Sequence, residues 1–358
     1  MPEIIILHDF DGKLYFKALE SKYKCIYLNS RPFRFLIRDL IKYKKITSET
    51  INSLIFLFTI PFCKDKTILI GMAPLNLRVA IYGWLCFKNK VILHSSWHEW
   101  DKKVPFDYGF FNKIIRPVWR YFILHCSKVI AVTSATKNSI LDFVNNHSVD
   151  IVVIPHVVDI EIIKHEDLLE KWNNEKINVL FVGRLTPEKG INELISLSNE
   201  ELLHLDNITI SIVGKGDLAQ QVINACTINP RLEYLGYISS RDELRKLFAN
   251  NKFFLLPSKK IKGWEELFGL VIVEAMSQGC IVITTDHIGP REIVYNNVDG
   301  IITNEGNYSR TVVDTIESYL ESNDEFIKMS IQAVSKSEKY NFDNISKLWV
   351  DAIKNINQ

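Results

Sequence analysis

The sequence of 358 residues lacks the paired cysteines that mark disulfide scaffolds and zinc sites. It has no C-x-x-C pair, and no histidine stands at ligand spacing from a cysteine. The six cysteines are Cys25, Cys63, Cys86, Cys126, Cys226 and Cys280. This scatter predicts reduced, mostly buried thiols in a cytoplasmic protein and argues against a zinc site.

A long hydrophobic run is also missing. A helix that crosses a bilayer needs ~18–20 consecutive apolar residues. The longest candidate, 51–62, is shorter and contains Asn52 and Ser53. The opening residues, 1–10, read as a strand and lack the basic region and the long apolar core of a signal peptide. We therefore expect a cytoplasmic protein that does not span the membrane.

Net charge is nearly absent overall, but the two halves differ. The whole chain has a formal charge of +1. Residues 1–160 contain 22 Lys and Arg against 13 Asp and Glu, a charge of +9, so the remainder carries −8. A basic half can meet an anionic surface, although such an imbalance can also serve solubility alone.

The length exceeds that of a usual single domain and indicates two. With 47% hydrophobic and 24% charged residues, the composition is that of a soluble globular chain. A polar stretch, 165–176, precedes a clean strand pattern. We predict an N-terminal domain over 1–165 and a C-terminal domain over 166–340. The segment 341–358 is predicted to form a helix that crosses back to the first domain.

Short apolar runs alternate with helical patterns along the whole chain. The strand-like runs are 4–7, 67–70, 90–93, 128–132, 150–154, 177–182, 208–213, 231–237, 253–257 and 280–284. This alternation predicts an α/β protein with parallel sheets covered by helices on both faces. Ligands of such sheets bind beyond the carboxyl ends of the strands.

Two segments of the basic half, 31–45 and 113–121, combine cations with apolar and aromatic residues at helical spacing. The residues that we single out are Arg34, Arg38, Lys42, Arg116 and Trp119. Each segment alone is typical of a solvated surface helix. Because both segments lie on the basic half, contact with an anionic membrane surface and a purely solvated role are interpretations of about equal weight. Nucleic acid is the weaker partner because no recognised binding motif accompanies the charge.

The stretch 264–279, WEELFGLVIVEAMSQG, places two acids around a loop-to-helix turn. Glu266 comes just before Phe268-Gly269, and Glu274 follows eight residues later in a helix-forming run. Gly269 permits the tight turn because it has no side chain. The free N–H groups of the helix that follows can bind phosphate. The acids could then hold sugar hydroxyls on both sides of a bound diphosphate. The alternative is an ordinary amphipathic helix with a surface Glu at each end.

A second motif, GRLTPEKG, covers 183–190. Thr186 is a good N-cap and Pro187 a good first helical residue, so a helix is predicted to begin there. Arg184 lies in the loop before it and Lys189 in its first turn. Two cations and free N–H groups at one point can compensate a diphosphate. The alternative is a capped helix with a solvated lysine.

Taken together and in order, these motifs resemble those of family-four retaining glycosyltransferases, with their E-x7-E signature. GKGD at 214–217 resembles the G-x-G turn of that family, and RLEYLGY at 231–237 resembles the loop near the nucleotide base. The family has the GT-B fold, with two Rossmann-like doubly wound parallel-sheet domains that face a central cleft. By this resemblance, the domain over 1–165 would bind the acceptor and the domain over 166–340 the nucleotide sugar. The resemblance covers nearly all of the second half and, more weakly, much of the first. In the first half His156-Val157 replace the usual Asn-Gly, and the usual Gly-rich loop is reduced to Gly12.

The resemblance implies a nucleoside-diphosphate sugar, UDP- or GDP-linked, as the donor, and neither a metal nor a cofactor. Asp9-x-Asp11 is accordingly read as a turn and not as a metal site. The implied catalytic residues are Glu266, His94, Arg184 and Lys189. The donor-binding set adds Gly12, Gly183, Gly214, Tyr237, Phe268, Gly269, Leu270 and Glu274. The basic and aromatic residues named above, together with His98, would face the acceptor or a membrane.

The resemblance also implies a place in surface polysaccharide synthesis, such as O-antigen of lipopolysaccharide or capsule. The acceptor would be a hydroxyl of a glycan or of a polyprenyl-diphosphate-linked oligosaccharide. The protein would then be cytoplasmic and peripheral on the cytoplasmic face of the inner membrane. Two alternatives remain. A GT-B nucleotide-sugar epimerase would release an epimer without any glycoside, and an inactive nucleotide- or glycan-binding protein would bind the donor without transfer.

Overall fold

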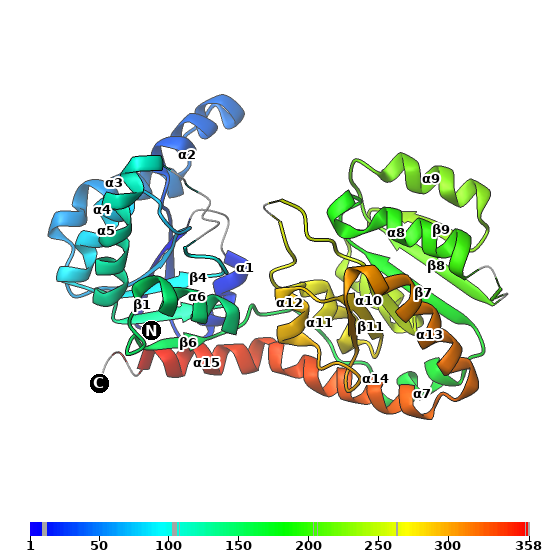
Figure 1. Cartoon of the computed structure of the whole chain (residues 1–358). Helices are drawn as coiled ribbons and strands as arrows, with labels where there is room; N and C mark the ends of the chain where they lie inside the picture. Colours follow the sequence, from blue (N-terminus) through cyan, green and yellow to red (C-terminus); the bar gives the residue numbers. More distant parts are fainter. Residues whose placement is uncertain are drawn as a thin grey trace. The chain divides into compact units, whose positions relative to one another are not determined.

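The structure, a computed structural model, describes residues 1–8, 13–101, 106, 108–202, 204–205, 207–262, 264–354 and 356, with the side chains of 13 and 14 left aside. The chain divides into two compact units. The first comprises Met1–Val157 with Phe342–Gln358, and the second comprises Val158–Asn341. Each unit is built around a six-stranded parallel sheet with helices on both faces (Figure 1).

The strands of the first sheet are β1 (Glu3–His8), β2 (Lys24–Asn29), β3 (Thr67–Gly71), β4 (Lys90–Ser95), β5 (Lys128–Ala131) and β6 (Ile151–Val153). Their order is β2-β1-β3-β4-β5-β6. The order reverses between β1 and β3, so the crevice expected to hold a ligand lies beyond the carboxyl ends of these two strands.

Helices and short helical turns connect these strands. They are α1 (Lys13–Phe16), η1 (Lys17–Ser21), α2 (Pro32–Arg38), η2 (Asp39–Tyr43), α3 (Ser48–Thr59), η3 (Ile60–Phe62), α4 (Val79–Tyr82), η4 (Gly83–Phe87), η5 (Gly109–Phe111), α5 (Asn112–His125), α6 (Ser134–Val144) and α15 (Phe342–Lys354). One face of the sheet packs on Trp119 and Phe122 of α5 and on Phe143 of α6. The other face packs on Phe16 of α1 and on Trp349 of α15.

The C-terminal helix, α15, belongs to the first unit because it completes that second face. Ile345, Trp349 and Ile353 recur at helical spacing and are buried against β1 and β4 residues. Ser346 adds a hydrogen bond from its hydroxyl to the carbonyl oxygen of Ala18, at 2.9 Å. Without α15 this side of the sheet would lie open to water.

The second sheet contains β7 (Ile177–Val182), β8 (Ile208–Val213), β9 (Leu232–Gly236), β10 (Phe253–Leu256), β11 (Ile281–Thr285) and β12 (Ile301–Thr303). Their order is β12-β11-β10-β7-β8-β9. This is the arrangement of a dinucleotide-binding sheet, and it reverses between β7 and β10. The loops after these two strands therefore border the expected ligand crevice.

The helices of the second unit are α7 (His165–Asn173), η6 (Pro187–Lys189), α8 (Ile191–Ser196), η7 (Leu197–Glu201), α9 (Ala219–Ile228), α10 (Arg241–Asn250), α11 (Leu270–Ser277), α12 (Ile288–Ile293), η8 (Glu305–Asn307), α13 (Tyr308–Glu321), α14 (Asp324–Ser337) and η9 (Glu338–Tyr340). Ser240 caps α10, since its hydroxyl accepts a hydrogen bond from the N–H of Glu243 at 3.3 Å. Trp172 of α7 is fully buried beside the Phe253 ring.

The units change at Val157–Val158, a few residues before the division at 165 that the sequence suggests. Residues 158–164 join the second unit through backbone hydrogen bonds. The N–H of Val158 donates to the Tyr340 carbonyl at 2.9 Å, and that of Ile163 donates to the Ser277 carbonyl at 3.0 Å. The polar composition of 165–176 indicated a linker. These backbone bonds assign residues 158–164 to the second unit.

Some local features differ from the expectation. The helix predicted over 31–45 ends at Tyr43 and changes from α2 to the wider η2 at Asp39, after which Lys44 has a positive φ of 50°.

None of the described helices combines the length and the hydropathy that crossing a bilayer requires. The six cysteines are free thiols, with Cys280 buried and the others half-buried.

Candidate functional site

Three loops converge at the carboxyl edge of β7, β8 and β10 because glycines allow their backbones to touch. Gly190 has a φ of +73°, and a Cβ there would overlap the carbonyl oxygen of Pro257. A Cβ on Gly214 would overlap the Gly183 carbonyl oxygen, and one on Gly216 would overlap that of Leu185. The absence of these side chains brings the GRLTPEKG and GKGD loops together with the loop after β10.

The helix predicted to start at Thr186 begins later. Pro187–Lys189 form the short turn η6, Gly190 ends it, and the α-helix begins at Ile191. Thr186 is at the N-cap position but makes no side-chain capping bond. Lys189 is therefore the last residue of a tight turn, where its side chain can leave the helix direction and reach across the edge of the sheet.

Lys189 reaches the loop after β10 and forms an ion pair with Glu266. Both side chains are largely buried, and the Lys189 ammonium lies 5.1 Å from the centre of the Trp264 ring. A largely buried ion pair beside an aromatic ring is screened less than a surface pair. The structure thus brings together one cation and one acid of the predicted site.

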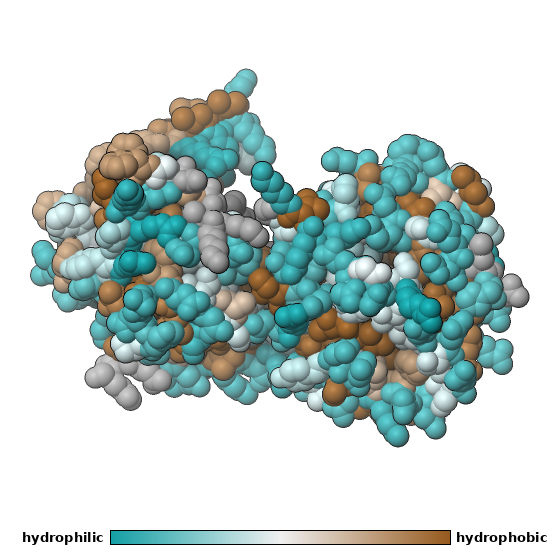
Figure 2. Space-filling model, in the orientation of Figure 1, coloured by the Kyte–Doolittle hydropathy of each residue, from teal (hydrophilic) through white to brown (hydrophobic). Residues whose placement is uncertain are grey.

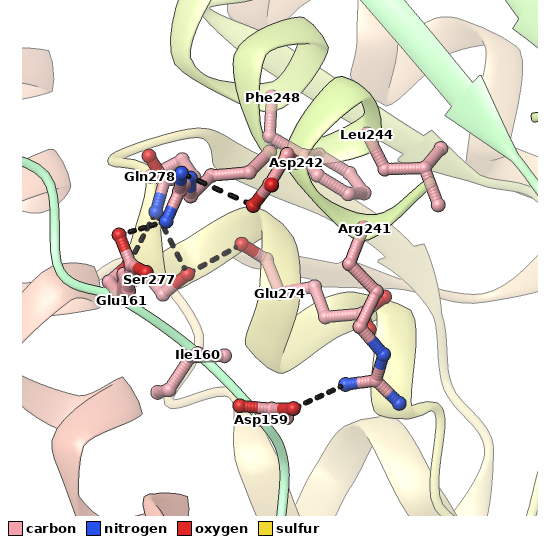
Figure 3. A pocket seen from close by; sticks show the side chains of 11 residues that line it. Asp159, Ile160, Glu161, Arg241, Asp242, Leu244, Phe248, Glu274, Ser277 and Gln278 are labelled. Atoms are coloured by element: carbon pink, nitrogen blue, oxygen red, sulfur yellow. Dashed lines mark hydrogen bonds and ion pairs between the residues drawn. The ribbon is translucent and has the colours of Figure 1, made fainter. Parts of the chain in front are cut away.

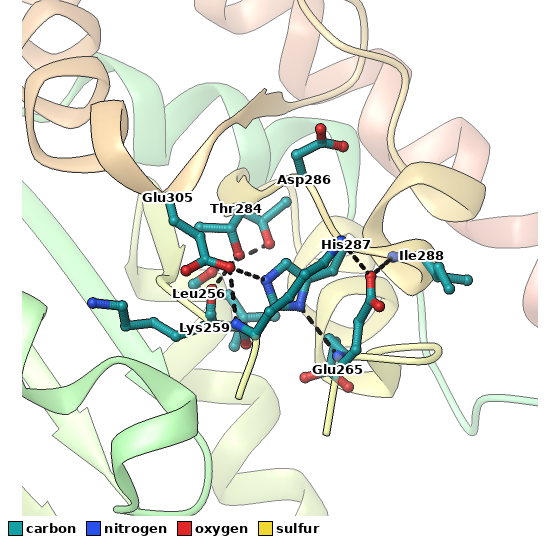
Figure 4. A network of polar contacts seen from close by, with 12 residues as sticks. Leu256, Lys259, Glu265, Thr284, Asp286, His287, Ile288 and Glu305 are labelled. Carbon is teal, nitrogen blue, oxygen red and sulfur yellow. Dashed lines mark hydrogen bonds and ion pairs between the residues drawn. The ribbon is translucent and has the colours of Figure 1, made fainter. Parts of the chain in front are cut away.

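A hydrogen-bond network fixes the loop that carries Glu266 (Figure 4). The Glu266 N–H donates to Nδ1 of the buried His287 at 3.2 Å, and His287 Nε2 lies 3.2 Å from Glu305 Oε1. Since Nδ1 accepts, the ring proton is on Nε2, which donates to Glu305. Burial lowers the pKa of His287, which favours this neutral tautomer.

Further bonds tie the same loop to the turn after β11. The Gly289 N–H donates to the Glu266 carbonyl at 2.9 Å, and the Ile288 N–H donates to Glu265 Oε1 at 3.1 Å. Gly289 cannot be replaced without displacing the chain, because a Cβ there would overlap the Phe268 backbone. The acid at 266 is held by its backbone on two sides.

The helix that follows, α11, presents an open amino-terminal end. Gly269 stands at its N-cap position with a φ of +82°, and no side chain described in the structure caps this turn. Phe268 is buried and packs near the Tyr340 ring, whereas Leu270 is half-exposed. The first N–H groups of α11 and the positive end of its dipole are therefore available to an anion at the loop–helix junction.

Glu274 lies one turn into α11 and faces a cavity of about 210 Å³ (Figure 3). The walls come from the segment 159–161 and from α10. Arg241 Nη1 and Asp159 Oδ2 form an ion pair at 3.3 Å at its rim. Burial raises the pKa of Glu274, while the Arg241 charge opposes that rise. Glu274 thus belongs to a cavity whose lining includes neither Glu266 nor Lys189.

The remaining donor-site candidates of the second unit border this edge. Arg184 is 60% exposed and lies 3.5 Å from Glu188, so it does not join the Lys189–Glu266 pair. Tyr237, after β9, is exposed, with the Lys215 ammonium 3.8 Å from its ring centre. An exposed aromatic ring after β9 offers a flat surface on which a base could stack.

In the first unit, the His94 ring belongs to a cluster of aromatic rings at the carboxyl edge of β1, β4 and β6. The centre of its ring lies 6.5 Å from that of His8, 6.3 Å from that of His156 and 5.0 Å from that of Phe16. Burial, and then the two histidines, hold the pKa of His94 well below its usual value. Burial and His8 lower that of His156 to about 4. The rings of His94 and His156 are therefore neutral near pH 7.

The two other candidates of the first unit are Gly12 and His98. Gly12, like Asp9 and Asp11, lies outside the described residues. His98 follows β4 and is half-buried, with its ring 6.4 Å from that of Trp97.

Of the acceptor or membrane candidates, Trp119 requires a correction. It is fully buried in the core, and its indole N–H donates to the Asn76 carbonyl at 3.1 Å. Its helix, α5, turns this aromatic side inward, so Trp119 cannot meet a partner. Arg116 is bound to Asp101, whereas Arg34, Arg38 and Lys42 are exposed on α2 and η2.

Sequence patterns did not single out His287 or Arg241. His287 is distant from Glu266 in the chain, and a lone histidine after a strand carries no signal of its own. Arg241 stands directly after Ser240, a residue type that signals a helix start and no ligand. Its place beside Glu274 follows from the packing of α10 against α11.

Comparisons with known proteins agree with this geometry. Residues 165–336, most of the second unit, match the family described as glycosyl transferases group 1. An uncharacterized glycosyltransferase of Methanocaldococcus jannaschii is 28% identical over 63% of this chain and 60% of its own length. A phosphatidyl-myo-inositol mannosyltransferase of Mycolicibacterium smegmatis is 31% identical over 38% of this chain and 34% of its own. The chain thus spans less than two thirds of these relatives.

Solved structures extend the likeness over the whole chain. Anabaena HepE in complex with UDP has a TM-score of 0.69 at 17% identity and covers 99% of this chain and 100% of that one. A glycosyltransferase from Rickettsia africae has a TM-score of 0.69 at 17% identity, covering 100% and 99%. At this identity the likeness concerns the fold. The predicted GT-B fold, α/β with two doubly wound parallel sheets, is confirmed.

Proposed function

We propose that this protein is a retaining glycosyltransferase that moves a sugar from a nucleoside-diphosphate sugar to a hydroxyl of an acceptor. The observation that carries the proposal is the meeting of Lys189 and Glu266 at the reversal point of a dinucleotide-type sheet, beside the open end of α11. A diphosphate needs cations and N–H groups, and a sugar needs a fixed carboxylate. These groups lie at one edge.

The proposed roles follow from where charge develops. Breaking the bond to the sugar leaves negative charge on the diphosphate, and Lys189, with Arg184, would compensate it together with the first N–H groups of α11. Charge stabilisation of this kind usually lowers the barrier most. Glu266 would hold the donor sugar, and Glu274, in its cavity with Arg241, the ribose hydroxyls. The acceptor would attack from the leaving-group face, and the diphosphate would take its proton.

No metal is included in this proposal, because Lys189, Arg184 and the end of α11 would together compensate the charge of the diphosphate. UDP is the proposed nucleotide, with GDP as the alternative, since HepE was solved with UDP and with UDP-glucose. Exposed Tyr237 would stack on the base.

For the acceptor we propose a glycan or a lipid-linked oligosaccharide of a surface polysaccharide, made on the cytoplasmic face of the inner membrane. One relative, 30% identical over 40% of this chain, is an uncharacterized protein in the cps region of Klebsiella pneumoniae. The named mannosyltransferase acts on phosphatidyl-myo-inositol, a lipid. Both relatives support an acceptor of this class.

A thermal-shift screen against UDP, GDP, ADP and their sugars tests the donor. A ligand at 100 times its Kd stabilises the folded state by about 2.7 kcal/mol, which raises the melting temperature by several degrees. We expect one nucleotide to give such a shift and Lys189→Ala to abolish it. A screen in which no nucleotide shifts the transition would contradict the proposal. Release of an epimer without any glycoside would identify an epimerase instead.

A further inference from the structure

The helices at 32–62 in the first unit have a partly inverted arrangement: they bury several polar side chains and expose several large apolar ones, while Phe56, Leu57 and Ile60 pack inward. The buried residues here include Asp39, Thr50 and Ser53. The outward apolar face consists of Ile37, Leu40, Ile41, Ile55, Phe58 and Phe62. Ordinary surface helices place their apolar stripe against the core. This arrangement needs a reason for keeping large apolar side chains in contact with solvent.

Asp39 holds the inverted arrangement in place. Its Oδ2 accepts hydrogen bonds from the Thr47 N–H at 2.9 Å and from the hydroxyls of Thr47 and Thr50, both at 2.7 Å. Its Oδ1 accepts from Arg38 Nη2 at 2.7 Å. The Thr47 N–H, followed by these side chains, holds the Asp39 pKa well below its usual range despite burial. The carboxylate locks the corner between η2 and α3.

Ser53 anchors α3 to the sheet. Its hydroxyl accepts a hydrogen bond from the Asn29 N–H at the end of β2, at 2.9 Å, and donates to the Glu49 carbonyl at 2.7 Å. These bonds fix which side of α3 faces inward. The outward direction of Ile55 and Phe58 is therefore imposed by specific polar contacts.

The apolar face is large and continuous. Its six side chains range from 52% exposed at Leu40 to 82% at Phe62, and α2 packs beside α3. Figure 2 shows hydrophobic residues gathered at the upper left, where Figure 1 places α2 and α3. Trp84 and Phe87 of η4, next to η3, extend it. A monomer that remains in water seldom exposes such a patch.

Cations accompany the apolar face and acids are scarce. Residues 31–64 contain seven Lys and Arg against two acids, a charge of +5. One of these acids, Asp39, is buried and neutralised by Arg38. Arg34, Lys42 and Lys45 are exposed and alternate in the sequence with the apolar residues of α2 and η2. Charge and apolar area thus favour a partner that is anionic at its surface and apolar beneath.

We propose that the apolar face docks onto an anionic lipid bilayer, with Ile41, Phe58 and Phe62 entering the acyl boundary and the lysines meeting the headgroups. Interfacial binding by apolar area and by charge together is the usual physics of peripheral helices. A second copy of the chain fits less well, because a two-fold contact would bring two surfaces of charge +5 together. The proposal names a partner and does not rest on the transfer reaction.

Flotation with vesicles tests the proposal on the whole chain. We expect the protein to float with phosphatidylglycerol–phosphatidylcholine vesicles at low salt and to float less with pure phosphatidylcholine. Ile41→Ser should weaken partition about fivefold to tenfold, because one exposed aliphatic side chain no longer enters the bilayer. Ile228→Ser, at an equally exposed isoleucine of the second unit (81% against 76%), is the matched control and should leave partition unchanged.

A second pair of variants tests the electrostatic contribution to vesicle binding. Reversal at Lys42 and Lys45 should weaken binding to anionic vesicles by about tenfold or more. The same reversal at Lys246 and Lys328, which are exposed on α10 and α14, should not. Salt should reduce wild-type binding without abolishing it, because apolar insertion is not screened.

Three outcomes would overturn the proposal. Wild-type protein could fail to float with anionic vesicles at low salt, or Ile41→Ser and Ile228→Ser could weaken flotation equally. The wild type could also sediment as a dimer that Ile41→Ser dissociates, without flotation, which would make this face a self-interface. The nucleotide-induced thermal shift is measured on each variant, so that a failed donor assignment stays distinguishable from a failed docking assignment.

Discussion

The two sheets reverse their strand order at comparable places but line those places with opposite chemistry. At the β7/β10 reversal the structure gathers ionised groups, with Lys189 paired to Glu266. Next to the β1/β3 reversal, His8 of β1 and His94 of β4 lie together, and no carboxylate of the described residues is among the groups that shift the His94 pKa. The same architecture thus offers one charged edge suited to an anion and one edge, here called the neutral edge, with the uncharged rings of His94 and His156.

The largest expected effect would break the charged edge. Lys189→Ala removes the cation proposed to meet the departing diphosphate, so we expect kcat to fall about 10²–10³-fold, as for loss of one preorganised charge-stabilising donor. Lys246→Ala on the solvent face of α10 is the control. Steady-state kinetics with the nucleotide sugar found by the thermal screen would measure this, and near-normal turnover of Lys189→Ala would refute the assignment.

Next in size is a backbone change at the same edge. Gly190→Ala should lower the free energy of unfolding by about 3 kcal/mol, because the new Cβ would overlap the Pro257 carbonyl and the residue has a positive φ. Gly306→Ala has the nearest neighbour of its Cβ at 3.5 Å and serves as the control. Denaturant unfolding compares the two, and equal midpoints would contradict the close packing of the loops.

The neutral edge predicts a dependence on pH. His156 has a folded pKa of about 4 against an ordinary value near 6.5. Its contribution to stability is complete above pH ~6.5 and is lost as pH falls toward 4, by up to about 3 kcal/mol. Urea unfolding from pH 7.5 to 4.5 should show the fall, and His156→Gln should flatten it. An unchanged slope in the variant would assign the effect to other groups.

The smallest effect should come from removing the side chain of His287, which supports the Glu266 loop. His287→Ala removes the acceptor for the Glu266 N–H, so the loop is held less firmly, and we expect kcat/KM to fall about tenfold. His287→Asn, whose side-chain oxygen can accept the same bond, should restore part of the loss. Equal activity in wild type and His287→Ala would mean that the remaining Gly289 and Ile288 bonds hold the loop alone.

Much of the fold follows from local sequence pattern. The strands predicted at 177–182 and 208–213 are β7 and β8, because buried parallel strands read as uninterrupted apolar runs. β2, with the sequence KCIYLN, was missed, since an edge strand keeps polar residues. β12 is three residues long and leaves too short a pattern to recognise.

The site was less readable, for physical reasons. Lys189 and Glu266 were identified from motifs, but their ion pair depends on Gly190 and Pro257 touching across the sheet. The direction of the 31–62 helices could not be read from spacing, because a buried Asp39 reverses the usual rule that apolar residues face inward. Contacts between distant residues decide both features.

The ion pair of Lys189 with Glu266 has one more consequence. When the site is empty, the Glu266 carboxylate already neutralises the Lys189 ammonium. A small anion therefore gains little free energy by binding there. A nucleotide sugar supplies a diphosphate for the lysine and hydroxyls for the acid in the same molecule. We therefore expect selection for the intact donor over inorganic phosphate to arise from this exchange of partners.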